Sequence, residues 1–141
     1  MKKKLLAIIF ATCLLFGAQS LAANTNDTGW DWDMPRLSLA RSTPERAKTN
    51  STPVYFYISS YKSSSTEGSI LLSVRGQTGA MFTNGKKFVV YADRIGKYCL
   101  SSNAYEDYGS GVFVKVRGDR QVANYIAASG VWSPDSSSCQ K

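Results

Sequence analysis

The sequence predicts an all-β protein, a small antiparallel β-sandwich or barrel of six to seven strands with an extended N-terminal arm. After Pro53 the chain consists of short runs rich in Val, Ile, Tyr and Phe, and each run ends at Gly, Ser, Asn or Asp. Such runs are typical of strands and turns. Several of them alternate apolar and polar residues, so each strand offers one face to a core. The pair Asn84-Gly85 also favours a two-residue hairpin turn.

The first 22 residues have the pattern of a secretory signal peptide. Three lysines, Lys2 to Lys4, precede an apolar run from Leu5 to Phe16, and the segment ends in small residues. We expect cleavage after Ala22, with Ala23 as the alternative. A retained membrane helix is disfavoured because the apolar run is shorter than the ~20 residues that span a bilayer. The sequence therefore predicts a secreted, extracellular protein without a transmembrane anchor.

Residues 23–52 are polar and show no sustained period of two or 3.6, so we expect an extended polar arm. Asp27, Asp31 and Asp33 lie in it without a neighbouring base. Their carboxylates can serve as calcium ligands, but the spacing is not that of an EF-hand. A solvated loop is the alternative, and the sequence alone leaves this choice open.

Residues 53–141 form the predicted β domain. Alternation predicts strands around 54–58, 70–74, 112–116 and 122–132, although 122–128 also fits two helical turns. The Asn84-Gly85 turn would place Met81 opposite Phe88. Residues 63–68 and 105–111 are expected to be loops.

Two cysteines, Cys99 and Cys139, follow the predicted signal. In an exported chain two thiols most simply form one disulfide. It would tie the end of the chain to a strand and contribute about 4 kcal/mol in the chain-entropy model. Two free or buried thiols are the alternative.

The composition argues against an enzyme. The chain has no histidine, which excludes a Ser-His-Asp triad and histidine-ligated zinc. The triplet Asp27-Thr28-Gly29 resembles an aspartic-protease motif, but it occurs once and in a polar segment. We therefore expect no catalytic residues, no metal and no cofactor.

Surface binding is the chemistry that the composition favours. The chain holds eight tyrosines, six phenylalanines and three tryptophans, and exposed aromatic rings can stack on sugars or lie at lipid headgroups. The alternative is that these rings pack in or around the core. Basic residues outnumber acidic ones, 17 to 10, which favours an anionic wall polymer or lipid surface, or a protein partner. Export argues against nucleic acid. The candidate ligand contacts are Trp30, Trp32, Tyr55, Tyr57 and Trp132, and the candidate basic surface is Lys86, Lys87, Lys115 and Arg117.

Three segments also carry a family resemblance: Asn26-Asp27-Thr28-Gly29-Trp30, residues 46–55 and residues 130–136. They resemble a family of small secreted proteins of unknown function from Gram-positive bacteria, whose members are often found near bacteriocin or transport genes. The resemblance implies secretion and a β-rich domain, and it supplies no catalytic residues.

These observations lead to two hypotheses. The first is a secreted, non-enzymatic β-domain protein that binds at or outside the cell envelope. The second is a bacteriocin-like antagonistic protein, or a bacteriocin-associated immunity or accessory protein, and it depends on the resemblance alone.

Overall fold

The computed structural model describes residues 23–83, 87–92 and 94–139. The described residues form nine strands and one short helix: β1 (Thr28–Met34), β2 (Ala40–Ser42), β3 (Arg46–Lys48), β4 (Val54–Ser63), β5 (Ser69–Gly76), β6 (Phe88–Tyr91), β7 (Gly96–Leu100), α2 (Ala104–Tyr108), β8 (Val112–Arg120) and β9 (Ile126–Ser133). The predicted all-β class is confirmed, with more strands than the six or seven expected.

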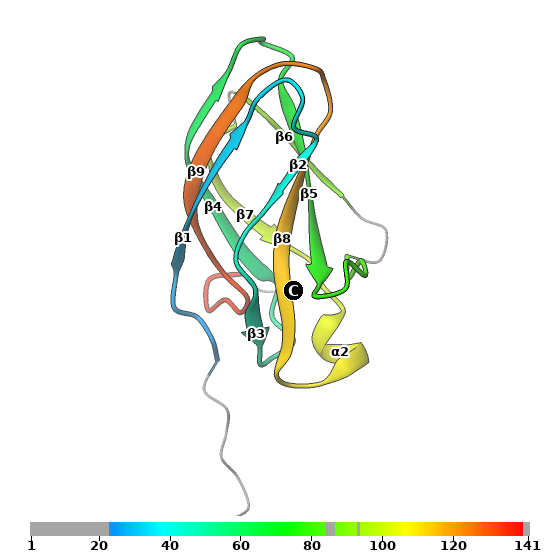
Figure 1. Cartoon of the computed structure of the whole chain (residues 1–141). Helices are drawn as coiled ribbons and strands as arrows, with labels where there is room; N and C mark the ends of the chain where they lie inside the picture. Colours follow the sequence, from blue (N-terminus) through cyan, green and yellow to red (C-terminus); the bar gives the residue numbers. More distant parts are fainter. Residues whose placement is uncertain (1–22, 84–86, 93, 140–141) are drawn as a thin grey trace, which may run out of the picture.

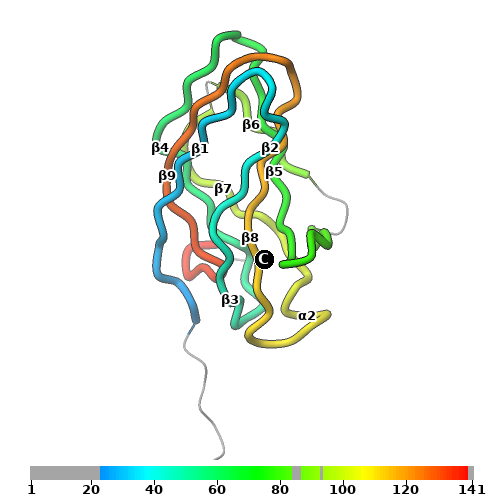
Figure 2. The backbone as a smooth tube through the Cα atoms, viewed as in Figure 1, coloured from blue at the N-terminus to red at the C-terminus, as the bar shows by residue number. Residues whose placement is uncertain are grey.

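The strands form two antiparallel sheets that pack face to face (Figure 1). Sheet A has the order β1-β9-β4-β7. Sheet B has the order β2-β8-β5-β6, and β3 also pairs with β8. The chain crosses between the two sheets at six connections, namely β1–β2, β3–β4, β4–β5, β6–β7, β7–β8 and β8–β9 (Figure 2). It stays within sheet B from β2 to β3 and from β5 to β6.

The core lies between the sheets and is filled by the inward residues of each alternating strand. Trp30 and Trp32 from β1 pack on Phe56 of β4, with ring centroids 4.6 Å and 5.5 Å from that of Phe56. Ile70, Leu72 and Val74 of β5 are fully or almost fully buried opposite them. The period of two in the sequence therefore marks the core face correctly.

The segment expected to be a polar arm is part of the sandwich. Residues 28–48 contribute β1, β2 and β3, and β1 pairs with β9 along its whole length. The arm prediction over residues 23–52 is therefore wrong, and the β domain begins before residue 53. The physical reason is that β1 is an edge strand with a polar outer face, so its composition resembles that of a loop.

Two local predictions also need correction. Residues 104–108 form the helix α2 instead of a loop. The predicted turn at Asn84-Gly85 lies outside the described residues, but Met81 pairs with Arg75 and Phe88 pairs with Leu72. Met81 and Phe88 therefore follow one another along the edge of β5 and do not face each other.

The predicted disulfide is present between Cys99 and Cys139, with the Cα atoms 5.6 Å apart. It ties the C-terminal segment to β7. The predicted signal peptide, residues 1–22, lies outside the described residues. Within the described ranges, no helix has the length and apolar character needed to cross a membrane.

Candidate functional site

Strands β1, β9 and β4 present a continuous surface on the side of sheet A that faces away from the core. We call it the outer face of sheet A. Asp31 lies on β1 and Tyr57 on β4, each between two buried neighbours, and Val131 lies on β9 beside the buried Trp132. The register places Val131 between Gly29 and Tyr57. Side chains from three strands can therefore contact one ligand.

A β-bulge bends β4 in the middle of this face. The pairing of β4 with β9 shifts between Ile58 and Ser60, so Ser59 is the extra residue. The Ser59 hydroxyl donates a hydrogen bond to the carbonyl oxygen of Ser129 at 3.1 Å. A Cβ atom at Gly130 would lie 1.8 Å from the Tyr57 carbonyl oxygen, so only glycine fits there. Because a bulge bends and twists its strand, it gives the face a concave shape.

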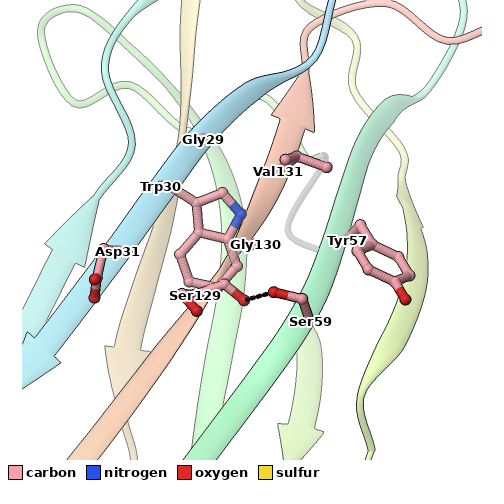
Figure 3. Close-up of a pocket in the computed structure, with 8 residues that line it drawn as sticks. All are labelled: Gly29, Trp30, Asp31, Tyr57, Ser59, Ser129, Gly130 and Val131. Atoms are coloured by element: carbon pink, nitrogen blue, oxygen red, sulfur yellow. Dashed lines mark hydrogen bonds between the residues drawn. The ribbon is translucent and has the colours of Figure 1, made fainter.

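The concave region is an open hollow of about 540 Å³, which we call the sheet hollow. Figure 3 shows Asp31 at its β1 side and Tyr57 at its β4 side, with β9 between them. Tyr57 is 38% exposed. The hollow is lined by Gly29, Trp30, Asp31, Tyr57, Ser59, Ser129, Gly130 and Val131. It combines one exposed aromatic ring with hydroxyl and carboxylate groups.

A second, smaller hollow of about 200 Å³ lies near the start of β4, and we call it the end hollow. Its lining includes Tyr55, which shares the outer face with Tyr57, and Asp27. Burial raises the pKa of the Tyr55 phenol, and the nearby negative charge of Asp27 raises it further. The phenol therefore stays protonated and able to donate a hydrogen bond at neutral pH. The other lining residues are Thr25, Ser133, Ser136, Ser137 and Ser138.

A buried ion pair holds the C-terminal wall of the end hollow in place. The Lys48 ammonium lies 3.1 Å from the Asp135 carboxylate, and both side chains are fully buried. Lys48 also donates to the carbonyl oxygens of Thr52 and Pro134. The other carboxylate oxygen of Asp135 accepts hydrogen bonds from the Asn24 amide, the Thr49 amide and the Thr49 hydroxyl. We call this set the clasp.

The hydrogen-bond donors and the Lys48 ammonium around Asp135 favour the ionised form of its carboxyl group. Burial by itself raises the pKa of the Asp135 carboxyl, but the hydrogen bonds from Thr49 and Asn24 and the charge of Lys48 outweigh burial, so the pKa is lowered. Every charge has partners, as a buried pair requires. We therefore expect the clasp to stabilise the fold by joining the segment around Lys48 to the segment around Asp135.

The groups in the two hollows suit binding by ring stacking and hydrogen bonding. In the part of the chain that the structure describes, no three His, Cys, Asp or Glu side chains lie together as a metal site. Asp31 and Asp33 point outward at alternate positions of β1. Asp31 and Asp33 therefore share the outward face of β1.

The predicted aromatic contacts divide into two groups. Tyr55 and Tyr57 lie on the outer face, as ligand contact requires. Trp30, Trp32 and Trp132 are buried, with 6%, 2% and 0% exposure, which agrees with the alternative that these rings pack in the core, although Trp30 also lines the sheet hollow. They face inward because the space between the sheets needs their volume, and Asp31 and Asp33 occupy the outward positions of β1.

The predicted basic surface is also altered by its neighbours. Lys115 forms an ion pair with Glu45 at 2.7 Å, and Arg117 forms one with Asp119 at 2.8 Å. Lys87 is exposed, and Lys86 lies outside the described residues. The charges of Lys115 and Arg117 are therefore partly compensated within the chain, which weakens the expected attraction of anionic polymers to sheet B.

Comparison with known proteins gives a family and no function. A family model described as a protein of unknown function, DUF2712, matches residues 18–136. The chain belongs to the DUF2712 family. The match spans all nine described strands and the clasp residue Asp135, and it stops before Cys139. No curated protein and no solved structure matches the chain significantly.

Sequence reasoning missed the serine and glycine residues that shape the sheet hollow of this DUF2712 chain. Ser59 and Ser129 gave no signal because their role depends on the pairing of β4 with β9. Gly130 did offer one, because a lone glycine inside an alternating strand often marks a bulge. The clasp was also missed, since nothing local shows that Lys48 meets Asp135.

Proposed function

We propose that the protein is a secreted, non-enzymatic β-sandwich that binds a ligand at or outside the cell envelope through the outer face of sheet A. The signal-like residues 1–22 support export. The disulfide between Cys99 and Cys139 supports an oxidising compartment. The resemblance noted in the sequence extends the proposal to Gram-positive bacteria and to an association with bacteriocin systems.

The proposed ligand is a sugar-containing polymer of the cell wall. The observation that carries this choice is the sheet hollow, where the exposed ring of Tyr57 lies beside hydroxyl and carboxylate groups. An aromatic ring can cover the apolar face of a sugar ring, while the surrounding oxygens accept hydrogen bonds from sugar hydroxyls. The carboxylate of Asp31 in the sheet hollow and that of Asp27 in the end hollow disfavour an anionic stretch of polymer on this face. We therefore favour neutral or amine-bearing sugars.

Cosedimentation with purified cell walls tests the proposal. The chain from residue 23 to 141 should be retained on walls, and Tyr57→Ala should weaken retention about tenfold, since stacking and ring burial are lost. Because stacking is not driven by net charge, raised salt should leave most of the retention in place. Tyr91→Ala is the matched control, because Tyr91 is 50% exposed but lies on β6 of sheet B.

Two results would overturn the proposal. One is retention of the Tyr57→Ala variant equal to that of the unchanged chain. The other is absence of retention on every wall preparation while circular dichroism shows the protein folded.

A further inference from the structure

Two loops at one end of the sandwich expose large hydrophobic side chains. The β1–β2 loop, residues 35–39, carries Leu37 at 95% exposure and Leu39 at 73%. The β8–β9 loop, residues 121–125, carries Val122 and Tyr125 at 37% and 40%. Figures 1 and 2 show both connections at the same end of the molecule. We call these two loops the loop tip.

Hydrogen bonds from Arg120 hold the two loops of the loop tip in a defined conformation. The guanidinium group of Arg120, only 9% exposed, donates to the carbonyl oxygens of Pro35 and Asn124, both at 2.7 Å, and to that of Arg36. The Arg120 amide donates to the Leu39 carbonyl oxygen at 2.9 Å. One buried cation therefore binds both loops together and satisfies their backbone acceptors.

This construction makes the exposure of the leucines costly unless something covers them. Leaving a leucine side chain in water forgoes the favourable transfer of its apolar surface out of water. Both leucines nevertheless project from a loop that is fixed at both ends by Arg120. Because the backbone is already ordered, a partner that covers them loses little conformational entropy.

The charges of the loop tip indicate what that partner is. Residues 35–41 contain Arg36 and Arg41 and no acid, and residues 121–125 contain no charge. The nearest acids along the strands are Asp33, two residues before the β1–β2 loop, and Asp119, which pairs with Ala40 and forms an ion pair with Arg117. Apolar side chains flanked by arginines match a bilayer surface, where aliphatic groups enter the acyl boundary and arginines meet anionic headgroups.

We propose that the loop tip docks the protein on an anionic lipid surface, with Leu37 and Leu39 entering the boundary between headgroups and acyl chains. The loop tip comprises residues 35–39 and 121–125, whereas each side of a standard protein interface contributes roughly 20–30 residues. Its leucines also lack the hydrogen-bonding groups that a sugar ligand needs. This inference is independent of the proposed wall-binding face, because it uses other residues and another ligand.

Vesicle flotation tests the docking. The chain from residue 23 to 141 should float with phosphatidylglycerol vesicles and much less with phosphatidylcholine vesicles. Leu37→Ser with Leu39→Ser should lower partition about 100-fold, roughly tenfold for each leucine. Arg36→Gln should lower partition about fivefold on the anionic vesicles only.

Phe113→Ser is the control, because Phe113 is 47% exposed at the opposite end of β8. An unchanged Tm of the double serine variant shows that it folds. Equal flotation of this variant and the unchanged chain would overturn the proposal, as would absence of flotation on both vesicle types. A dimer in sedimentation equilibrium that the serine substitutions dissociate would also overturn it, with a second copy as the occupant.

Discussion

Asp135→Asn should be among the most destabilising single-atom changes in the chain. The substitution keeps the side chain's shape and removes the only carboxylate that is paired with buried Lys48 among the described residues. One carboxylate oxygen faces the Lys48 ammonium at 3.1 Å. The other accepts from the Thr49 hydroxyl at 2.6 Å and from two backbone amides at 2.9 and 3.0 Å. Whichever way the new amide turns, its NH₂ group faces a donor.

The expected loss follows from this geometry. Breaking a buried ion pair on one side costs about 3–5 kcal/mol, because the remaining charge stays buried without its partner. For a domain of about 120 residues, 1 kcal/mol corresponds to roughly 4 °C in Tm. We therefore expect Tm to fall by about 12–20 °C in a thermal melt followed by circular dichroism. Glu45→Gln, which breaks the partly exposed pair with Lys115, should change Tm far less.

The pH dependence gives an independent measurement. Because the pKa of Asp135 is lowered in the folded state, its stabilisation is complete above the unfolded carboxyl pKa of about 3.9 and is lost as pH falls through the folded pKa. The Tm difference between wild type and Asp135→Asn should stay constant from about pH 5 to 8 and shrink below about pH 4.

A double replacement keeps the prediction testable if the single variant does not fold. Lys48→Met with Asp135→Leu removes both charges and should recover much of the lost stability. Either of two results would refute the stabilising role of the clasp. One is a Tm loss of only a few degrees for Asp135→Asn, and the other is the same dependence of Tm on acid pH in variant and wild type.

Three further predictions concern the bulge, the disulfide and a buried phenol. Gly130→Ala should lower the free energy of unfolding in urea by about 3 kcal/mol, because the new Cβ would lie 1.8 Å from the β4 backbone. Gly29→Ala, where the nearest atom to a new Cβ is at 4.0 Å, should lower it far less. Equal losses in the two variants would contradict the close approach of β4 to Gly130. Reducing the Cys99–Cys139 disulfide should lower the free energy of unfolding by about 4 kcal/mol, because the bond links residues 40 apart in the chain. The reductant should leave the free energy of unfolding of a Cys139→Ser variant unchanged. Burial raises the pKa of Tyr61 well above 10, so the free energy of unfolding should fall as pH rises past about 10. Tyr61→Phe should reduce that fall. The same loss of stability at alkaline pH in variant and wild type would contradict the prediction.

The core could be predicted from the sequence wherever a strand alternates clearly. Ile70, Leu72 and Val74 are buried as their period of two indicates. The segment Trp30-Asp31-Trp32-Asp33 has the same alternation, yet its aspartates make it resemble a loop. The charges stand on the outward positions of an edge strand, where they discourage pairing with another chain. For β1, the alternation with a period of two therefore predicts a strand better than the polar composition of the segment does.

The candidate site was harder to predict because it depends on long-range pairing. The sheet hollow exists only after β1 and β4 pair on either side of β9. Ser59 and Ser129 meet through a bulge, and Lys48 meets Asp135 across 87 positions of the chain. No local pattern specifies such contacts. Tyr57 was predictable as an exposed ring, since it alternates with Phe56 and Ile58.

The two proposed surfaces share strands without sharing residues, which makes their independence testable. β1 and β4 end, and β9 begins, at the loop tip, whereas the sheet hollow lies farther along the same strands. A protein docked on lipid through the tip would therefore leave the outer face of sheet A open to wall polymer. Vesicle-bound protein should retain soluble wall fragments, Tyr57→Ala should lose only the fragments, and the double serine variant should lose only the vesicles. Displacement of the vesicles by fragments would show that both ligands use one surface, and the separation argued from the strand positions would then be wrong.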